Sequence, residues 1–158
     1  MSVMAGNFKK NFIRTNVVEA IEMSRGEYNL YRCWELPENE NGNDKGYLVC
    51  YGNGYESWCP KEQFEKNAIE IGDNEIERFT LEKLIVEKEV KTEYIFGKPY
   101  TIVNVKLSNG MILHSGTSCV DPKNYSEEIG AEICMRDIEK QMWFGLGFTL
   151  SLAQGLDK

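Results

Sequence analysis

The feature that most constrains this chain is the dipeptide Asn109-Gly110, which lies between two predicted strand segments. Both residues accept positive φ, so the pair is the strongest signal for a β-hairpin turn in the sequence. Residues 100–107 before it show the alternation of faces that half-buried strands have, and residues 111–115 after it are predicted to form the return strand. Residues 88–96 alternate in the same way. We therefore predict a three-stranded antiparallel meander over residues 88–118.

A polar segment, residues 115–122, is predicted to form an elbow between the last strand and a long helical segment. Ser126 is followed by two glutamates, which is typical of a helix start, because the hydroxyl caps and the acids favour the helix dipole. The helical segment is predicted to start at about residue 124, and Gly145 and Gly147 are expected to loosen or kink it. Its apolar stripe is predicted to comprise Ile129, Ile133, Cys134, Ile138 and Met142.

The N-terminal half has a different pattern. Residues 1–14 are predicted to be an arm, and residues 15–70 a small α/β module with many aromatic side chains. Ile71-Gly72-Asp73-Asn74 carries three turn-forming residues and is the predicted boundary. A helix over residues 76–86 then opens a C-terminal domain, residues 75–158. The predicted fold class is α+β.

Two local signals organise the N-terminal module. Ser24 and Glu27 have capping-box spacing, which predicts a short helix over residues 27–34. The apolar face of that helix is predicted to carry Leu30, Tyr31 and Trp34. Further along, Pro60 is predicted at the first position of another helix, with Cys59 as its N-cap. The favoured interpretation is that the aromatic residues form the core of a small domain, and the alternative is an aromatic recognition surface.

Composition narrows the range of partners. A net charge of −7 provides no basic face for a phosphate backbone, so duplex DNA or RNA is not expected as a partner. No apolar run approaches the roughly 18 residues that a membrane helix needs, so no membrane association is expected. Five cysteines without C-x-x-C spacing, together with one histidine, argue against a metal site and indicate free thiols in a reducing cytosol.

No catalytic constellation is visible, so we expect a protein that is not an enzyme and uses no cofactor. His114 has no acid or nucleophile at motif spacing, and Ser118-Cys119 has no neighbouring base. Glu127 and Glu128 are adjacent on a helix and point about 100° apart, so they cannot share one site. Glycine-rich phosphate-loop motifs are also absent from the sequence.

The elbow is the most suggestive candidate for binding. Gly116-Thr117-Ser118 offers hydroxyls and backbone N–H groups, which can bind a phosphate without much positive charge. Lys106 on the preceding strand can add one cation, and Tyr94 can add one stacking face. The alternative is an ordinary turn whose hydroxyls cap the next helix.

Several short motifs of the C-terminal half occur in one order and resemble a known family over about residues 79–152. They resemble the small phage protein family typified by the N4 gp49 and Sf6 gene-66 products. In this sequence Ser108 stands where that family usually has lysine. The motifs are Asn109-Gly110, Gly116-Thr117-Ser118-Cys119-Val120-Asp121-Pro122, Asn124-Tyr125, Glu128-Ile129-Gly130 and Trp143 through Phe148.

The resemblance implies a non-enzymatic function, because the family includes the anti-CBASS cyclic-nucleotide sponge. It implies a homo-oligomer, hexameric in known cases, that binds cyclic di- or trinucleotides between protomers and blocks CBASS-type immune signalling in the cytoplasm of an infected or lysogenic bacterial host. The expected ligand contacts are Tyr94 by stacking, Lys106 to phosphate, and Asn109, Thr117 and Ser118 by hydrogen bonds. Of these, Asn109 and Ser118 match family positions.

Residues 15–70 resemble a small accessory module found at the N-terminus of various phage proteins, and this likeness implies no activity. Val18-Glu19-Ala20-Ile21 and Trp58-Cys59-Pro60-Lys61 are among the residues that carry it. The alternative function is a phage accessory adaptor that binds a host protein through this aromatic module and binds no nucleotide. A hydrolase of the same messengers is the least favoured possibility, because no metal site or general base is visible.

Overall fold

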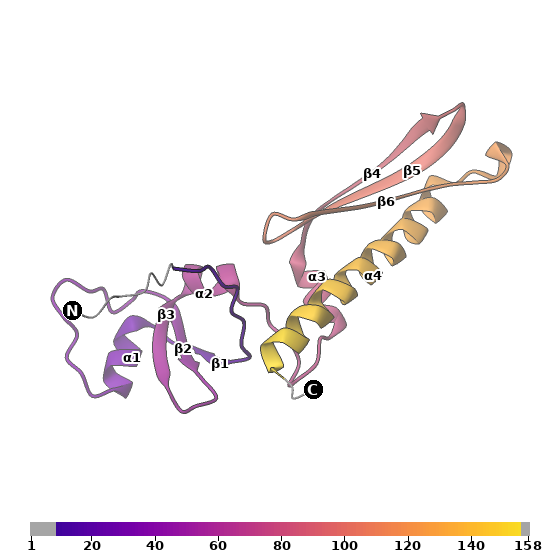
Figure 1. The fold of residues 1–158 in the computed structure, drawn as a ribbon. Coiled ribbons are helices and arrows are strands. Elements are labelled where there is room, and N and C mark those ends of the chain that lie inside the picture. The colour runs from indigo at the N-terminus through magenta and orange to yellow at the C-terminus, as the bar shows by residue number, and fades with distance from the viewer. Residues whose placement is uncertain (1–8, 156–158) are drawn as a thin grey trace.

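The computed structural model describes residues 9–155 and has a mixed α+β fold, which confirms the predicted class (Figure 1). This part of the chain forms two antiparallel sheets of three strands, each with its strands in chain order. The first sheet contains β1 (Glu19–Glu22), β2 (Gly46–Cys50) and β3 (Glu56–Pro60), and the second contains β4 (Ile85–Ile95), β5 (Lys98–Leu107) and β6 (Ile112–Ser118). The helices are α1 (Arg25–Tyr31), α2 (Lys61–Asn67), α3 (Arg78–Leu84), α4 (Glu127–Gln154) and the 3₁₀ turn η1 (Pro122–Asn124).

The predicted capping box is present at the start of α1. The Glu27 backbone N–H donates to the Ser24 hydroxyl at 3.2 Å, and the Ser24 backbone N–H donates to the Glu27 carboxylate at 2.7 Å. Two of the N–H groups that a helix start leaves without partners are thus satisfied. The hydrogen bond also lowers the pKa of the Glu27 carboxyl, since it favours the charged form.

The predicted apolar face of α1 is wrong. Tyr28 and Asn29 are the buried residues of this helix, whereas Leu30, Tyr31 and Trp34 are exposed. The physical reason is that the helix ends at Tyr31, and Cys33 adopts a φ of 57° that reverses the chain. Trp34 therefore lies outside the helix, and its ring packs nearly perpendicular to that of Tyr28, with ring centroids 6.0 Å apart.

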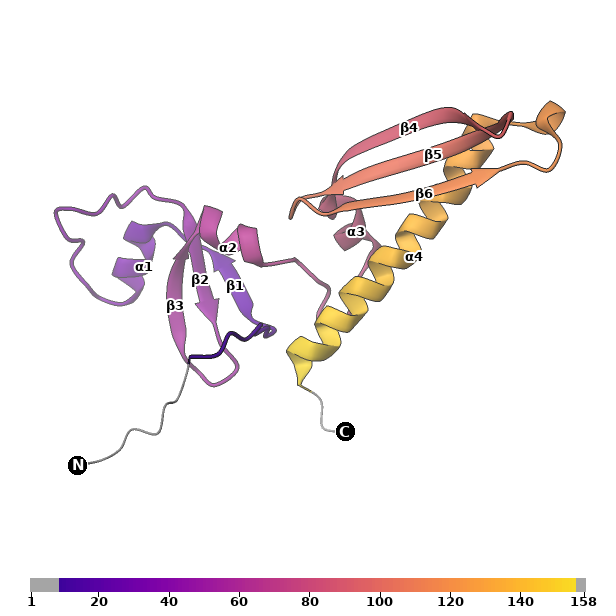
Figure 2. The same ribbon diagram turned by 45° about the horizontal axis from the view of Figure 1, so that its top comes forward.

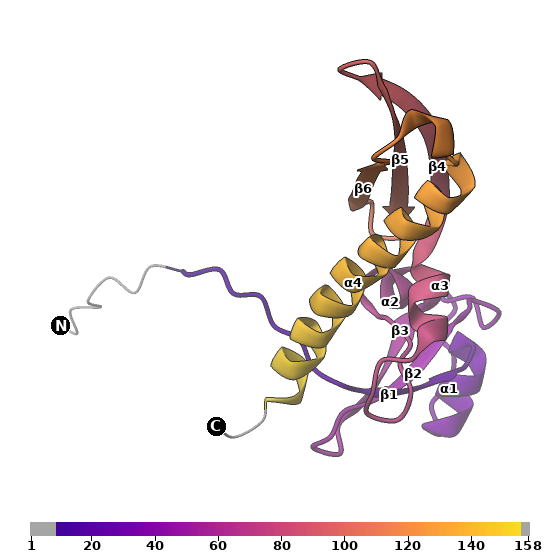
Figure 3. The ribbon, with the colours of Figure 1, turned by 90° about the vertical axis from the view of Figure 1, so that its right-hand side faces the viewer.

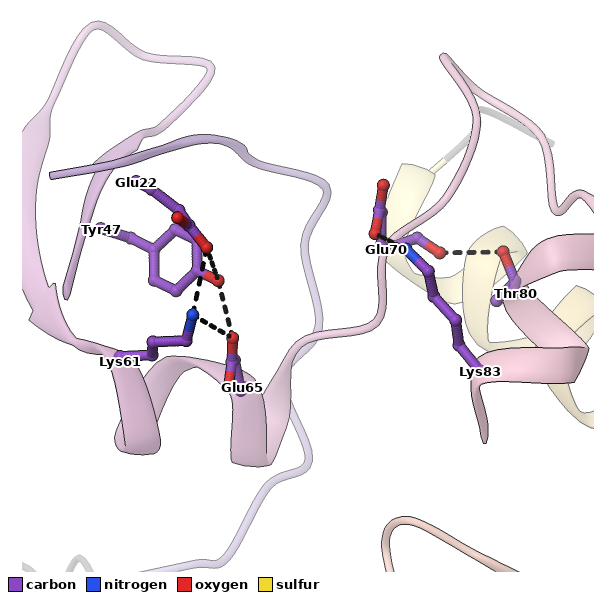
Figure 4. A network of polar contacts seen from close by, with 7 residues as sticks. All are labelled: Glu22, Tyr47, Lys61, Glu65, Glu70, Thr80 and Lys83. Carbon is purple, nitrogen blue, oxygen red and sulfur yellow. Dashed lines mark hydrogen bonds and ion pairs between the residues drawn. The ribbon is translucent and has the colours of Figure 1, made fainter. Parts of the chain in front are cut away.

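The predicted cap of α2 is also wrong. Cys59 belongs to β3, where it pairs with Tyr47, and Pro60 is the N-cap of α2, with no side-chain hydrogen bond. Helix α2 is held to the sheet by a polar cluster (Figure 4), in which the Tyr47 hydroxyl donates to Glu65 at 2.7 Å and Lys61 pairs with Glu22 at 3.1 Å. The Glu65 carboxylate, together with burial, raises the pKa of Tyr47 to about 12.

The predicted meander is confirmed. Strands β4, β5 and β6 pair in sequence, and Gly110 in the turn has a φ of 86°, which glycine adopts without strain. The Met111 backbone N–H donates to the Asn109 side chain at 3.0 Å and tightens this turn. The helix predicted over residues 76–86 is shorter, because Ile85 already pairs with Leu107 in the sheet.

The predicted elbow over residues 115–122 is partly wrong, because β6 continues to Ser118. Gly116 pairs with Ile102 and Thr117 pairs with Thr101 across the ladder. Gly116 fits here because the Tyr100 ring covers it, so that a Cβ would approach a ring carbon to 2.3 Å. The turn that remains is short and leads through η1 to Ser126, whose hydroxyl accepts the Ile129 N–H at 3.3 Å and caps α4 as predicted.

Helix α4 crosses one face of the second sheet and then projects beyond it (Figure 2). Its buried stripe recurs every four residues and packs on the inward side chains of β5. Thr101 is fully buried at one end of this contact, against Gly130. The core between sheet and helices comprises Leu81, Val103, Val105, Leu107, Cys134, Ile138 and Met142.

The C-terminal part of α4 departs from the prediction. The helix runs through Gly145 and Gly147 without interruption to Gln154 and is 28 residues long, about 42 Å at the usual rise. Figure 3 shows the same arrangement from the side, with the last turns of α4 beyond the second sheet. Two members of the predicted apolar stripe, Ile129 and Ile133, are 59% and 45% exposed, because the buried ridge passes beside them.

The linker between the two sheets is fixed to α3. The buried Thr80 hydroxyl donates to the Glu70 carbonyl at 2.8 Å, and Lys83 pairs with the Glu70 carboxylate (Figure 4). Nearby, the side chain of Gln154 at the end of α4 donates to Asn74 at 2.9 Å. These contacts fasten residues 70–74 to the helical part of the C-terminal half.

Candidate functional site

A cleft lies between the outer edge of β6 and one side of α4, and we call it the β6–α4 cleft. Its volume is about 440 Å³, which falls within the usual range for small-molecule sites. The strand contributes two hydroxyls and a glycine, and the helix contributes one apolar and three charged side chains. The lining residues are Ser115, Gly116, Thr117, Ile133, Arg136, Asp137 and Lys140.

Strand β6 brings backbone hydrogen-bonding groups to this cleft because it is the edge strand. The Leu107 N–H donates to the Met111 carbonyl at 2.8 Å. From Met111 onward, residues of β6 whose backbone groups bond β5 alternate with residues whose backbone groups point outward. The backbone groups of His114 and Gly116 consequently point away from β5. Gln141 on α4 accordingly donates to the outward carbonyl of His114, at 3.3 Å.

Helix α4 brings two cations to the same place. Arg136 and Lys140 are one turn apart, so both side chains lie on one side of the helix. Within residues 9–155, neither makes an ion pair, and Asp137 provides the negative charge beside them. Asp137 accepts a hydrogen bond from Gln141 at 3.3 Å. Two cations, two hydroxyls and an outward amide form a set of donors that suits an anionic ligand.

A smaller hollow of about 80 Å³ lies at the N-terminal end of α4 and shares Thr117 with the cleft. Beside it, the Tyr125 hydroxyl lies 2.7 Å from the Thr92 hydroxyl and 2.6 Å from that of Thr101. Thr92 also contacts the Glu127 carboxylate. This network fixes the first turn of α4 to the sheet, and therefore fixes the far end of the β6–α4 cleft.

The comparisons identify the family. A family model described as "Phage protein (N4 Gp49/phage Sf6 gene 66) family" matches residues 71–153, more than half of the 158-residue chain. The chain belongs to this family of phage proteins. A search of curated proteins and a search of solved structures found no match.

The segment that matches the family model, residues 71–153, contains the whole β6–α4 cleft, the smaller hollow and the five predicted ligand contacts. The first sheet, with α1 and α2, lies before it. In residues 9–155, no helix combines the length and apolar character needed to cross a membrane. The same residues contain no group of three or more His, Cys, Asp or Glu arranged to hold a metal ion.

Within the single chain, the fold brings two of the five predicted contacts together. Thr117 lines both hollows, and Ser118 lines the smaller one. Tyr94 is near the same end of the sheet but on the opposite edge strand, and it is 75% exposed. Lys106 pairs with Ile112, six positions along β6 from Ser118, which corresponds to about 20 Å. Asn109 lies beyond it, in the hairpin turn.

Lys106 differs from the cations of the cleft in its surroundings. Its ammonium pairs with the Glu87 carboxylate at 3.0 Å, on the sheet face away from α4. Sequence reasoning missed Arg136 and Lys140, which lie on the predicted helix. The available signal was their spacing of four residues on a helix, but their position opposite β6 depends on the tertiary fold.

Proposed function

We propose that this phage protein binds and sequesters cyclic oligonucleotide second messengers, that is cyclic di- or trinucleotides, without hydrolysing them, and so blocks CBASS-type immune signalling. The proposal includes assembly as a homo-oligomer. It follows the sequence resemblance, and the phage family of the chain is consistent with it. The single observation that supports it most is the pair of cations, Arg136 and Lys140, facing the outward backbone groups of β6.

The chemistry of the cleft suits a phosphodiester. A cyclic dinucleotide carries two negative charges, and Arg136 and Lys140 can each pair with one of them even though the whole chain has a charge of −7. The Asp137 carboxylate in the same cleft offsets one of these two cations. The arginine fork and the lysine ammonium can each bind one non-bridging oxygen, and the hydroxyls of Ser115 and Thr117 can donate to others. Ile133 offers an apolar surface, 45% exposed, on which part of a base can lie.

The test is calorimetric titration of the purified chain with cyclic di- and trinucleotides. Hydrogen bonds to charged groups contribute about 1.5–3 kcal/mol each, so Arg136→Gln or Lys140→Gln should weaken binding by roughly ten- to a hundredfold. Lys88→Gln and Lys98→Gln are the matched controls, since each removes one positive charge away from the cleft. Lys88 lies on the opposite edge strand, β4, and Lys98 lies on the sheet face away from α4.

Three outcomes are informative. Binding by the wild type and the controls, with loss in the cleft variants, supports both the function and its site. Equal binding by the wild type, the two cleft variants and the two control variants retains the function and rejects the cleft as its site. The absence of binding by the wild type for every cyclic nucleotide rejects the function.

A second candidate function is supported by the surface of the N-terminal half. Leu30 is 78% exposed, and Tyr31 and Trp34 are each slightly more than half exposed, all on or just after α1. Such a patch is typical of protein-interaction surfaces. We therefore retain the proposal of an adaptor that binds a host protein and no nucleotide. Its test is recovery of one identified host protein with the wild type but not with Leu30→Ser or Trp34→Ser, together with no response to cyclic nucleotides.

A further inference from the structure

The projecting half of α4 has no charged side chain. Residues 127–140 contain seven charged residues, whereas residues 141–154 contain none. Exposed helix surfaces normally carry charges, because polar residues cover the face that does not pack. The stretch therefore has the composition of a buried helix, although much of it is exposed in a single chain.

Three large side chains form a ridge along this stretch, and we call Phe144, Phe148 and Leu152 the α4 ridge. They are 80%, 66% and 51% exposed, and their spacing of four residues places them one above another. The ridge faces away from the core, since the buried Met142 lies about 160° around the helix from Phe144. Nothing in residues 9–155 covers it.

The sequence around the ridge is nearly symmetric about Phe148. Leucines stand two residues to either side, small residues stand three to either side, and large apolar residues stand four to either side. A two-fold contact brings the same patch of each copy onto the other, so it requires a self-complementary surface. The symmetric positions are Leu146 with Leu150, Gly145 with Ser151, and Phe144 with Leu152.

We propose that the α4 ridge is a two-fold interface between two copies of this chain, with the helices antiparallel and Phe148 at the axis. Phe144 of one copy then packs on Leu152 of the other, and Gly145 and Ser151 leave room for these side chains between the helices. The α4 ridge is then a contact surface of the homo-oligomer in the proposed function, and this inference rests on that homo-oligomer. It requires no nucleotide.

The lack of charge on the ridge permits a second copy as the occupant, and the exposed area of the ridge limits how tightly that copy can bind. Each chain has a net charge of −7, so two copies repel each other except where the contact itself carries no charge. An aromatic side chain offers about 150–250 Å² to a contact, so the ridge supplies roughly 400 Å² per copy. The pair then buries about 800 Å², below the roughly 1,200 Å² of standard interfaces. The expected contact is therefore reversible and depends on protein concentration.

The experiment measures the molecular mass of the purified full-length chain by sedimentation over a wide range of concentration. The wild type is expected to associate as concentration rises, and Phe148→Glu should shift that association to at least tenfold higher concentration. Phe96→Glu is the matched control, because Phe96 is fully exposed at the β4–β5 turn and far from the ridge. Circular dichroism establishes that each variant is folded.

Cross-linking tests the register. Phe148→Cys in a Cys33→Ser background should form a covalent dimer on mild oxidation, because the two copies of position 148 meet at the axis, whereas Phe96→Cys should not. A monomeric wild type at every concentration, or one that associates as Phe148→Glu does, overturns the proposal. Association of a monomeric wild type with neutral lipid vesicles also overturns it.

Titration of the wild type with cyclic nucleotides, alongside the sedimentation experiment, separates the two proposals. A nucleotide that binds while the wild type remains monomeric rejects the ridge and retains the ligand. A ridge-dependent dimer that binds no nucleotide retains the ridge and rejects the ligand.

Discussion

Replacement of Gly130 by alanine tests how α4 is seated on the second sheet. A Cβ at this position would lie 2.3 Å from the Thr101 hydroxyl oxygen and 2.7 Å from the Thr101 Cβ. Thr101 has no exposed surface, and its hydroxyl is 2.6 Å from that of Tyr125, so it cannot rotate away without breaking this contact. The helix or the strand must therefore shift to admit a methyl group.

The magnitude follows from two opposing contributions. Overpacking of a filled core costs about 1–3 kcal/mol. Alanine in a helix interior is favoured over glycine by about 1 kcal/mol, which offsets part of that cost. Gly147→Ala is the matched control, because Gly147 belongs to the same helix and a Cβ there would meet nothing within 4 Å. Both substitutions gain the same helix propensity, so their difference isolates the steric cost.

The assay is equilibrium urea unfolding of both variants, followed by far-ultraviolet circular dichroism at low protein concentration. The free energy of unfolding of Gly130→Ala should be about 1–3 kcal/mol below that of Gly147→Ala. Equal stability of the two variants would refute the reasoning, since it would mean that α4 does not press against Thr101.

Three further predictions concern hydrogen bonds elsewhere in the chain. Tyr125→Phe removes the contacts with Thr92 and Thr101 and should lower the free energy of unfolding by about 1–3 kcal/mol in urea titrations; an unchanged value would show that the network is not formed. Ser24→Ala removes the α1 cap and should cost about 0.5–2 kcal/mol, read as faster amide exchange in residues 25–31, and equal exchange rates would contradict it. Tyr47→Phe should destabilise the first sheet at about pH 8, and this cost should shrink by about pH 11. The folded pKa of Tyr47, about 12, exceeds the unfolded value of about 10, so its contribution is complete below about pH 10 and disappears as the pH rises through 12; a pH-independent difference in urea midpoint would contradict this.

The sequence was sufficient for prediction where the two partners of an interaction lie within a few residues of each other in the chain. Ser24 and Glu27 satisfy each other across three residues, so the helix start could be predicted from spacing alone. The position of the turn at Asn109-Gly110 could be predicted in the same way, because Gly110 adopts a positive φ. The register could not, because the Leu107 N–H bonds the Met111 carbonyl and the loop between them has three residues. The phage family was also indicated by short motifs of the second half.

Predictions failed where a distant segment decides the outcome. Strand β6 continues through Gly116 because Tyr100, on the neighbouring strand, packs over it. Helix α4 continues through Gly145 and Gly147 because its earlier turns are anchored on the sheet. Arg136 and Lys140 were overlooked for the same reason, since only the packing of α4 against β6 places them in a cleft.

The most direct test of the central claim is retention of intact ligand by the protein. The wild type is mixed with an equimolar cyclic nucleotide, passed through a filter that retains protein, and then denatured to release what it holds. We predict that the nucleotide stays with the protein and is recovered chemically unchanged, and that Arg136→Gln retains much less. Passage of every cyclic nucleotide through the filter, or recovery of a linear product, would contradict the account.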